Sequence, residues 1–282
     1  MVTFAPRVLD IDLEKRVASF DTYPDLTPLL GGLATGLELL RQHKENCLAV
    51  LSVGPLNGFF PFVSKFCALS IFPEGPREYY IGGRFALIMK FANIDSLIVR
   101  GVASEPLTLS VEPSGRVEFS PDLQEEEFLK IGVAGRRSFI TFGNDESLVD
   151  NYFIFDQAIG RKLYMGNLRR FLISASSSLK VGKPDEYKDI YSEILKKGSE
   201  LEVSYSDRSS CGLCPAGCSF SKETEERLEL VYSHCLVACG FASRIYENIP
   251  RIFSCLNSIG FPYKHEDLES LPEKIRYLRT HF

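Results

Sequence analysis

The chain has 282 residues, of which 45% are hydrophobic and 24% charged, as in an ordinary globular protein with one large domain or two smaller ones. Its 32 basic and 37 acidic residues give a formal net charge of −5, which argues against nucleic acid or an anionic membrane as the partner. No apolar run approaches the roughly 20 residues that span a bilayer, and acidic residues interrupt the N-terminal stretch where a signal peptide is apolar. We therefore expect a cytoplasmic protein.

The first two thirds of the chain are predicted to be dominated by strands. Two helices are expected there, over residues 25–42, where leucines recur at helical spacing, and over residues 84–93. Elsewhere, short runs rich in Val, Ile, Leu and Phe are separated by Gly, Pro, Asn and Asp, a pattern typical of strands and turns. The expected strands cover residues 47–54, 66–72, 78–83, 95–102, 107–112, 115–120, 137–143 and 170–176.

The pattern changes after Ser174, where a polar stretch of small residues is followed by helical periodicity. Helices are predicted over residues 186–195, 222–248, 250–258 and 271–280; the second would be about 40 Å long. Gly260 is expected to end the third of them. The sequence thus predicts an α+β fold, with a β-rich domain over residues 1–175 and a smaller α-helical domain over residues 176–282.

Eight cysteines separate into two groups. Cys47 and Cys67 lie in strand-like apolar runs, where a thiol acts as a small hydrophobic group, and we expect both to be buried. The remaining six are clustered near the C-terminal end, at Cys211, Cys214, Cys218, Cys235, Cys239 and Cys255.

The spacing Cys-x2-Cys-x3-Cys places three soft thiolate ligands in a glycine-containing loop, which suits a [4Fe–4S] cluster or zinc. If residues 222–248 form one helix, Cys235 and Cys239 share a face, so either could supply the fourth ligand; Cys239 is preferred, and Cys255 is a further candidate. Spacing alone does not separate iron–sulfur from zinc, and unliganded structural thiols are the remaining alternative.

Several motifs, taken in order, resemble the tungsten-containing aldehyde ferredoxin oxidoreductase family, through its N-terminal domain and the start of its second region. The match runs from the early glycine motifs through the cysteine motif to the C-terminal helices. The matching residues are Gly31, Gly32, Gly36, Gly54-Pro55-Leu56-Asn57-Gly58, Gly82-Gly83-Arg84-Phe85, Leu87, Lys90-Phe91-Ala92, Asp95, Ile131-Gly132-Val133-Ala134-Gly135, Gly160, Met165-Gly166, the three motif cysteines, Glu229 and Asn257-Ser258-Ile259-Gly260.

The resemblance implies a two-layered β base beneath a tungstopterin, with a [4Fe–4S] cluster that passes electrons to ferredoxin. It assigns three cluster ligands to Cys211, Cys214 and Cys218, and we expect their loop to pack near Lys65 and Gly82-Gly83. Cofactor-binding positions carried over by the resemblance are Lys65, Gly82, Gly83, Arg84 and Gly160.

Departures from the family pattern predict a weakened hold on the pterin. Lys65 stands where the family has arginine, so the charge is kept but the planar fork that binds phosphate in two bonds is lost. Leu33 and Ala158 stand at further positions where the family has arginine, and the family's downstream pterin-binding segments have no counterpart in this sequence. We therefore expect no aldehyde oxidation by this chain alone, and tungstopterin binding is doubtful.

The leading hypothesis is an iron–sulfur protein similar to aldehyde ferredoxin oxidoreductase, acting in electron transfer as a shortened subunit or paralogue. Its partner would be ferredoxin or a partner oxidoreductase chain, with a homodimer as another assembly. Two alternatives stay open: a complete small tungstopterin oxidoreductase acting on aldehydes, and a non-redox structural paralogue with zinc or no metal. No catalytic residues can be assigned from the sequence.

Overall fold

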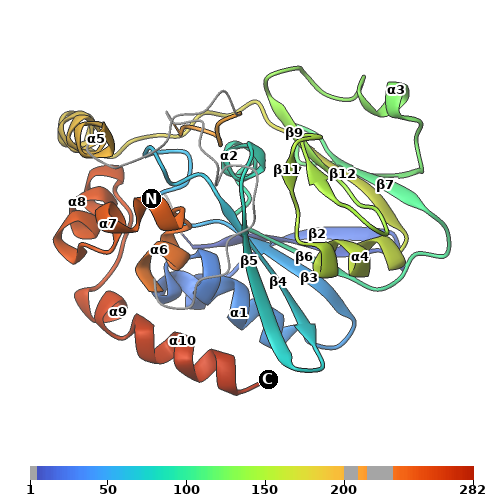
Figure 1. Cartoon of the computed structure of the whole chain (residues 1–282), viewed down its shortest axis with the longest axis horizontal. Helices are drawn as coiled ribbons and strands as arrows, with labels where there is room; N and C mark the ends of the chain where they lie inside the picture. Colours follow the sequence, from blue (N-terminus) through green and yellow to red (C-terminus); the bar gives the residue numbers. More distant parts are fainter. Residues whose placement is uncertain (1–4, 200–208, 215–230) are drawn as a thin grey trace.

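The computed structural model describes residues 5–199, 209–214 and 231–282. It contains two six-stranded mixed sheets followed by helices (Figure 1). Sheet A has the order β2-β1-β6-β3-β4-β5, built from β1 (Arg7–Asp12), β2 (Val17–Thr22), β3 (Cys47–Ser52), β4 (Phe66–Phe72), β5 (Gly75–Ile81) and β6 (Ser96–Arg100). Sheet B has the order β11-β10-β9-β12-β7-β8, built from β7 (Leu107–Val111), β8 (Val117–Pro121), β9 (Arg137–Thr141), β10 (Leu148–Val149), β11 (Phe153–Ile154) and β12 (Leu168–Ser174).

Each sheet contains one parallel strand pair within a mainly antiparallel ladder. In sheet A, β1 pairs with β6 in parallel, with Leu9 opposite Leu97, although 88 residues separate them in the chain. In sheet B, β12 pairs with β7 in parallel. Successive parallel βα units are not seen in the described residues, so the expectation of a sheet-dominated N-terminal region in an α+β fold is confirmed.

The helices divide between the sheets and the C-terminal region. Within the first 175 residues lie the 3-10 helix η1 (Pro24–Leu29) and α1 (Gly32–Gln42), α2 (Phe85–Phe91), α3 (Glu125–Phe128) and α4 (Gln157–Met165). The C-terminal region holds α5 (Pro184–Ser199), α6 (Val231–Leu236), η3 (Gly240–Ala242), α7 (Ser243–Tyr246), α8 (Ile249–Ile259), α9 (His265–Glu269) and α10 (Leu271–Thr280). In the described residues, no helix is both long and apolar enough to cross a bilayer.

Two sequence-based helix predictions require correction. The helix expected over residues 25–42 is interrupted, because Leu30 and Gly31 have positive φ angles of 64° and 144° between η1 and α1. The long helix expected over residues 222–248 is wrong in its described part. It ends at Leu236, because Val237 turns to a φ of 56°, and only short helices follow.

Period-two alternation on the strands of sheet A sends neighbouring side chains to two separate cores. The inter-sheet cluster lies between the sheets and includes Leu9, Leu51 and Leu97. The helix-side cluster lies on the opposite face of sheet A and includes Val8, Val50 and Ile98, together with α1 and the C-terminal helices. The predicted boundary between residues 175 and 176 falls just after β12; the division into two domains there stays a prediction.

Both cysteines that were expected in the core are buried. Cys47 in β3 is 5% exposed and Cys67 in β4 is fully buried. Burial raises the pKa of the Cys47 thiol to about 12, so this thiol is held in its neutral form. Both residues therefore act as the small hydrophobic groups that the sequence predicted.

Candidate functional site

The first two motif cysteines lie in a tight turn, which we call the cysteine turn (residues 211–214). The N–H of Cys214 donates to the carbonyl of Cys211 over 3.1 Å, and Leu213 takes a φ of 58°. The N–H of Gly212 donates to the carbonyl of Gly83 over 2.9 Å. The cysteine turn is therefore attached to the turn at Gly82-Gly83, which precedes α2 and which we call the glycine turn, in agreement with the prediction that this loop lies near Gly82-Gly83.

The cysteine turn lies where the two apolar clusters meet. Cys211 is 8% exposed and belongs to the inter-sheet cluster, whereas Cys214 is half-buried and packs against both clusters. Cys218 lies outside the described residues. The two described thiols are thus held in a largely apolar environment with one of them accessible from solvent.

Cys235 and Cys239 are not on one helix. Cys235 ends up fully buried in α6, where burial raises the pKa of its thiol to about 12. Cys239 follows the break at Val237, is half-buried, and its N–H donates to the carbonyl of Phe62 over 3.4 Å. The argument that these two thiols share a helical face is therefore wrong, although neither is excluded as a ligand.

Cys255 lies in α8 and is fully buried, with the pKa of its thiol raised to about 12 by burial. Within residues 5–199, 209–214 and 231–282, no three His, Cys, Asp or Glu side chains gather closely enough to hold a metal ion. The proposed cluster ligands include Cys218, so the assembly of the complete ligand set stays a prediction.

Two close backbone contacts fix the position of the end of α6. A Cβ at Gly54 would lie 2.2 Å from the carbonyl oxygen of Leu236, and a Cβ at Gly32 would lie 2.6 Å from that of Cys235. Glycines at these two positions let the last turn of α6 rest directly on the N-terminus of α1 and the end of β3. The early glycine motifs thus position the second cysteine-containing segment.

The glycine turn itself is held by sheet B. Gly83 takes a φ of 98°, a conformation that favours glycine, and a Cβ there would lie 3.0 Å from Phe153 and Val149. The backbone N–H of Arg84 donates to Asp150 over 3.4 Å, and its guanidinium donates to the carbonyl of Gly135 over 2.5 Å. Burial raises the pKa of Asp150 even though Ser138, Phe139 and Arg84 donate to its carboxylate.

The other two positions carried over from the resemblance are Lys65, which adjoins this turn because Phe66 pairs with Ile81, and Gly160 in α4. Lys65, just before β4, is 1% exposed, and its carbonyl accepts a 3.1 Å bond from the amide of Asn57. Gly160 lies in α4, where a Cβ would be 2.4 Å from the hydroxyl oxygen of Ser147. The close contact with Ser147 therefore accounts for glycine at this position.

These contacts test whether the residues fit a pterin phosphate. The Arg84 guanidinium is engaged by a carbonyl, and Gly160 faces Ser147. Both residues thus make contacts within the protein that do not by themselves define an anion site, and we derive no role for a pterin. For an iron–sulfur cluster the donor chemistry does fit, because the cysteine turn offers soft thiols beside an apolar surface.

Sequence reasoning missed a buried polar network on the helix side of sheet A. Glu78 in β5 accepts bonds from Arg279 of α10, at 2.6 Å, and from the Tyr80 hydroxyl, at 3.2 Å. His234 of α6 stacks on Tyr80, and its Nδ1 lies 3.8 Å from Glu78. No sequence pattern could have signalled this network, since Glu78 and Arg279 are 201 positions apart.

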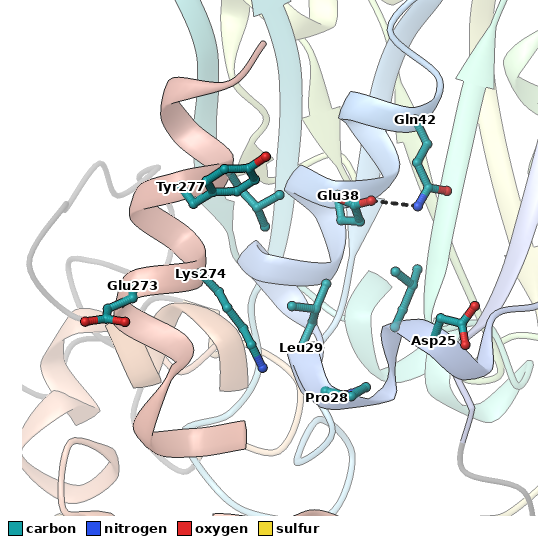
Figure 2. A pocket seen from close by; sticks show the side chains of 10 residues that line it. Asp25, Pro28, Leu29, Glu38, Gln42, Glu273, Lys274 and Tyr277 are labelled. Carbon is teal, nitrogen blue, oxygen red and sulfur yellow. Dashed lines mark hydrogen bonds between the residues drawn. The ribbon is translucent and has the colours of Figure 1, made fainter. Parts of the chain in front are cut away.

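A separate groove lies between η1, α1 and α10 (Figure 2). Its volume is about 590 Å³, and its lining is largely apolar. Two lining charges have partners, since Glu38 binds Arg41 at 2.7 Å and Lys274 lies 3.9 Å from Asp267. The groove contains none of the predicted site residues.

Two mixed sheets followed by helices, with the cysteine turn attached to the turn at Gly82-Gly83, define an α+β fold class. Residues 8–136 match the family model for the aldehyde ferredoxin oxidoreductase N-terminal domain. The predicted resemblance to this family is therefore confirmed for its N-terminal domain, over residues 8–136.

A solved structure shares the fold over most of the chain. It is a chain from the active site complex BamBC of benzoyl coenzyme A reductase in complex with 1,5-dienoyl-CoA, with a TM-score of 0.63 and 16% sequence identity. The similarity covers 90% of this chain and 53% of that chain, so this chain spans about half the length of its structural relative. No curated protein matches the sequence.

Proposed function

We propose that this protein is an iron–sulfur member of an oxidoreductase system, holding one [4Fe–4S] cluster and working in electron transfer beside a partner chain in the cytoplasm. The observation that carries the proposal is the 2.9 Å bond from Gly212 to Gly83, which attaches the cysteine turn to the aldehyde ferredoxin oxidoreductase N-terminal domain. The proposal places Cys211, Cys214 and Cys218 as three ligands of the cluster.

The surroundings of the cysteine turn support a redox role. An iron–sulfur cluster supplies one-electron transfer, and its potential depends on burial and on hydrogen bonds to sulfur. Cys211 would be screened from water by the inter-sheet cluster, whereas Cys214 is half-buried. The cluster would thus be shielded from water on the Cys211 side and accessible from solvent on the Cys214 side.

The degree of burial favours Cys239 as the fourth ligand. Cys235 and Cys255 are fully buried among apolar side chains of the helix-side cluster, so either would have to leave this packing to reach a cluster. Cys239 is half-buried and follows the end of α6, where the chain is no longer helical. Cys235 remains the second choice.

A partner chain is part of the proposal. The structural relative is itself a chain of a multi-chain complex, and this chain spans 53% of that relative. Ferredoxin or a partner oxidoreductase chain would exchange electrons with the accessible side of the cysteine turn. A homodimer is the outcome expected if the purified protein shows no such partner.

The experiment is anaerobic purification after expression with iron and sulfide available, followed by metal analysis and absorption spectroscopy. We expect about four irons per chain and a broad absorbance near roughly 400 nm that dithionite bleaches. C239S should lose most of this iron, whereas C47S, which removes a thiol buried in β3, should keep it. Zinc at about one per chain would instead identify the structural paralogue.

Activity separates this proposal from a complete tungstopterin enzyme. With tungstate or molybdate supplied during expression, we expect no reduction of viologen dye by aldehydes, since Arg84 and Gly160 offer no evident anion site. Turnover that follows bound tungsten or molybdenum would establish the complete enzyme in place of the electron-transfer protein.

A further inference from the structure

A short segment between the sheets and the C-terminal helices, residues 177–182, is fastened at both ends; we call it the strap. It leads from β12 toward α5 (Figure 1). At its start, the Ser177 hydroxyl donates to the carbonyl of Phe91, at the end of α2. Just after its end, the N–H of Lys183 donates to the carbonyl of Ser258 over 2.8 Å. The strap is therefore held between the α2 and α8 ends.

Two glycine contacts add to this fixation. A Cβ at Gly182 would lie 3.0 Å from the backbone of Gly260, so the strap and the C-cap of α8 pack backbone to backbone. A Cβ at Gly58 would lie 2.6 Å from the side chain of Leu179, so glycine at this position leaves room for the leucine. The strap thus has a defined path over the protein surface.

Under the strap lies a cavity of about 720 Å³, within the size range of small-molecule sites. None of the residues that line it belongs to the candidate iron–sulfur or pterin positions. Its apolar wall is formed by Pro55, Phe59, Leu179, Val181, Ile259 and Phe261. An apolar body of modest size would therefore lose its contact with water here.

Among the described residues, one exposed cation of the cavity lining has no acidic partner. Lys90 is paired with Asp95 at 2.6 Å, and Asp95 also accepts the N–H of Arg7 over 2.9 Å. Lys180, the other lining cation, forms no ion pair with any described residue. Ser178 and Asn93 add a hydroxyl and an amide to the lining.

We propose that this cavity binds a small organic anion with an apolar body. Lys180 pairs with the anionic group, and Val181, Phe59 and Phe261 cover the apolar body. The Lys90–Asp95 pair is already neutral and contributes shape, not net charge. The recognition is independent of the iron–sulfur cluster, because the lining shares no residue with it.

The test is a fluorescence titration of the full chain with 8-anilinonaphthalene-1-sulfonate, an apolar aromatic anion, and competition by octanoate. The variant K180E reverses the lining charge, and K44E makes the same change on the exposed turn after α1. We expect one site per chain, competed by octanoate, with K180E about tenfold weaker and K44E unchanged.

A second variant examines the apolar wall. V181D places a carboxylate on this wall and should weaken the probe at least as much as K180E, while circular dichroism reports whether the fold is kept. Equal affinities for K180E and K44E, no competition by octanoate, or binding of many probe molecules per chain would each overturn the proposal.

Discussion

The two faces of sheet A have different chemistry. The inter-sheet face is packed by apolar side chains, including the edge-on pair of Phe85 and Phe171 with centroids 5.9 Å apart. The helix-side face buries Glu78 with Arg279 and His234, beside Cys235. Since the same strands supply both faces, alternation gives an apolar core between the sheets and a second, largely apolar core that also buries a charged carboxylate. The cysteine turn lies where these cores meet.

The inter-sheet face should show the largest loss of stability. Phe171 is fully buried, so Phe171→Ala leaves a cavity between the sheets and is expected to lower the free energy of unfolding by about 3–5 kcal/mol. Urea denaturation followed by circular dichroism measures it. Val17→Ala, on a side chain that is 56% exposed, should change the value by less than about 0.5 kcal/mol. Similar losses for both variants would contradict an ordered inter-sheet core.

The helix-side face should respond to loss of a charge. Arg279→Ala leaves the carboxylate of Glu78, whose side chain is 8% exposed, without its cation, and should cost about 2–3 kcal/mol. The same denaturation measurement applies. The double variant Glu78→Gln and Arg279→Ala should recover part of this loss, because no unpaired charge remains. A double variant that is less stable than Arg279→Ala would show that the ion pair is not the source of the effect.

The smallest effect concerns the edge of sheet B that holds the glycine turn. Burial raises the pKa of Asp150 above its ordinary value of 3.8, so the folded state binds this proton more tightly than the unfolded state. Its contribution to stability is therefore present below pH 3.8 and is lost as the pH rises through the raised pKa. The stability of the wild type relative to Asp150→Asn should fall over this window, as denaturation at several pH values would measure. A difference that rises with pH would contradict the raised pKa.

Part of the fold was predictable because local signals agree with tertiary packing. β4 and α10 have the predicted bounds, Phe66–Phe72 and Leu271–Thr280, and Gly260 ends α8 with a left-handed φ of 77°. The hairpin of β1 and β2 was not predicted, since Asp10 and Asp12 make this segment appear turn-like. Their carboxylates bind Arg100 at 2.9 and 2.7 Å, a partner that only the parallel pairing with β6 provides.

The sequence predicted where the cysteine turn attaches, but it did not predict how the other cysteines are placed around it. The attachment of the cysteine turn near Gly82-Gly83 agreed with prediction, because the order of the motifs carried this information. The predicted placement of Cys235 and Cys239 on one helix was wrong, since α6 ends where it contacts Gly32 and Gly54, about 200 positions earlier in the chain. Helical periodicity contains no information about such a distant contact.

The position of β6 between β1 and β3 has a consequence for the order of folding. As the chain leaves the ribosome, β1 can pair with β2 at once, but its other edge waits until Arg100 has been synthesised. β3 waits in the same way for β6, although β4 and β5 can join it locally. Two half-sheets with open edges therefore coexist until one five-residue strand joins them, and such edges invite pairing with other chains. Slow synthesis or mutation in β6 should accordingly lead to aggregation before it affects the finished protein.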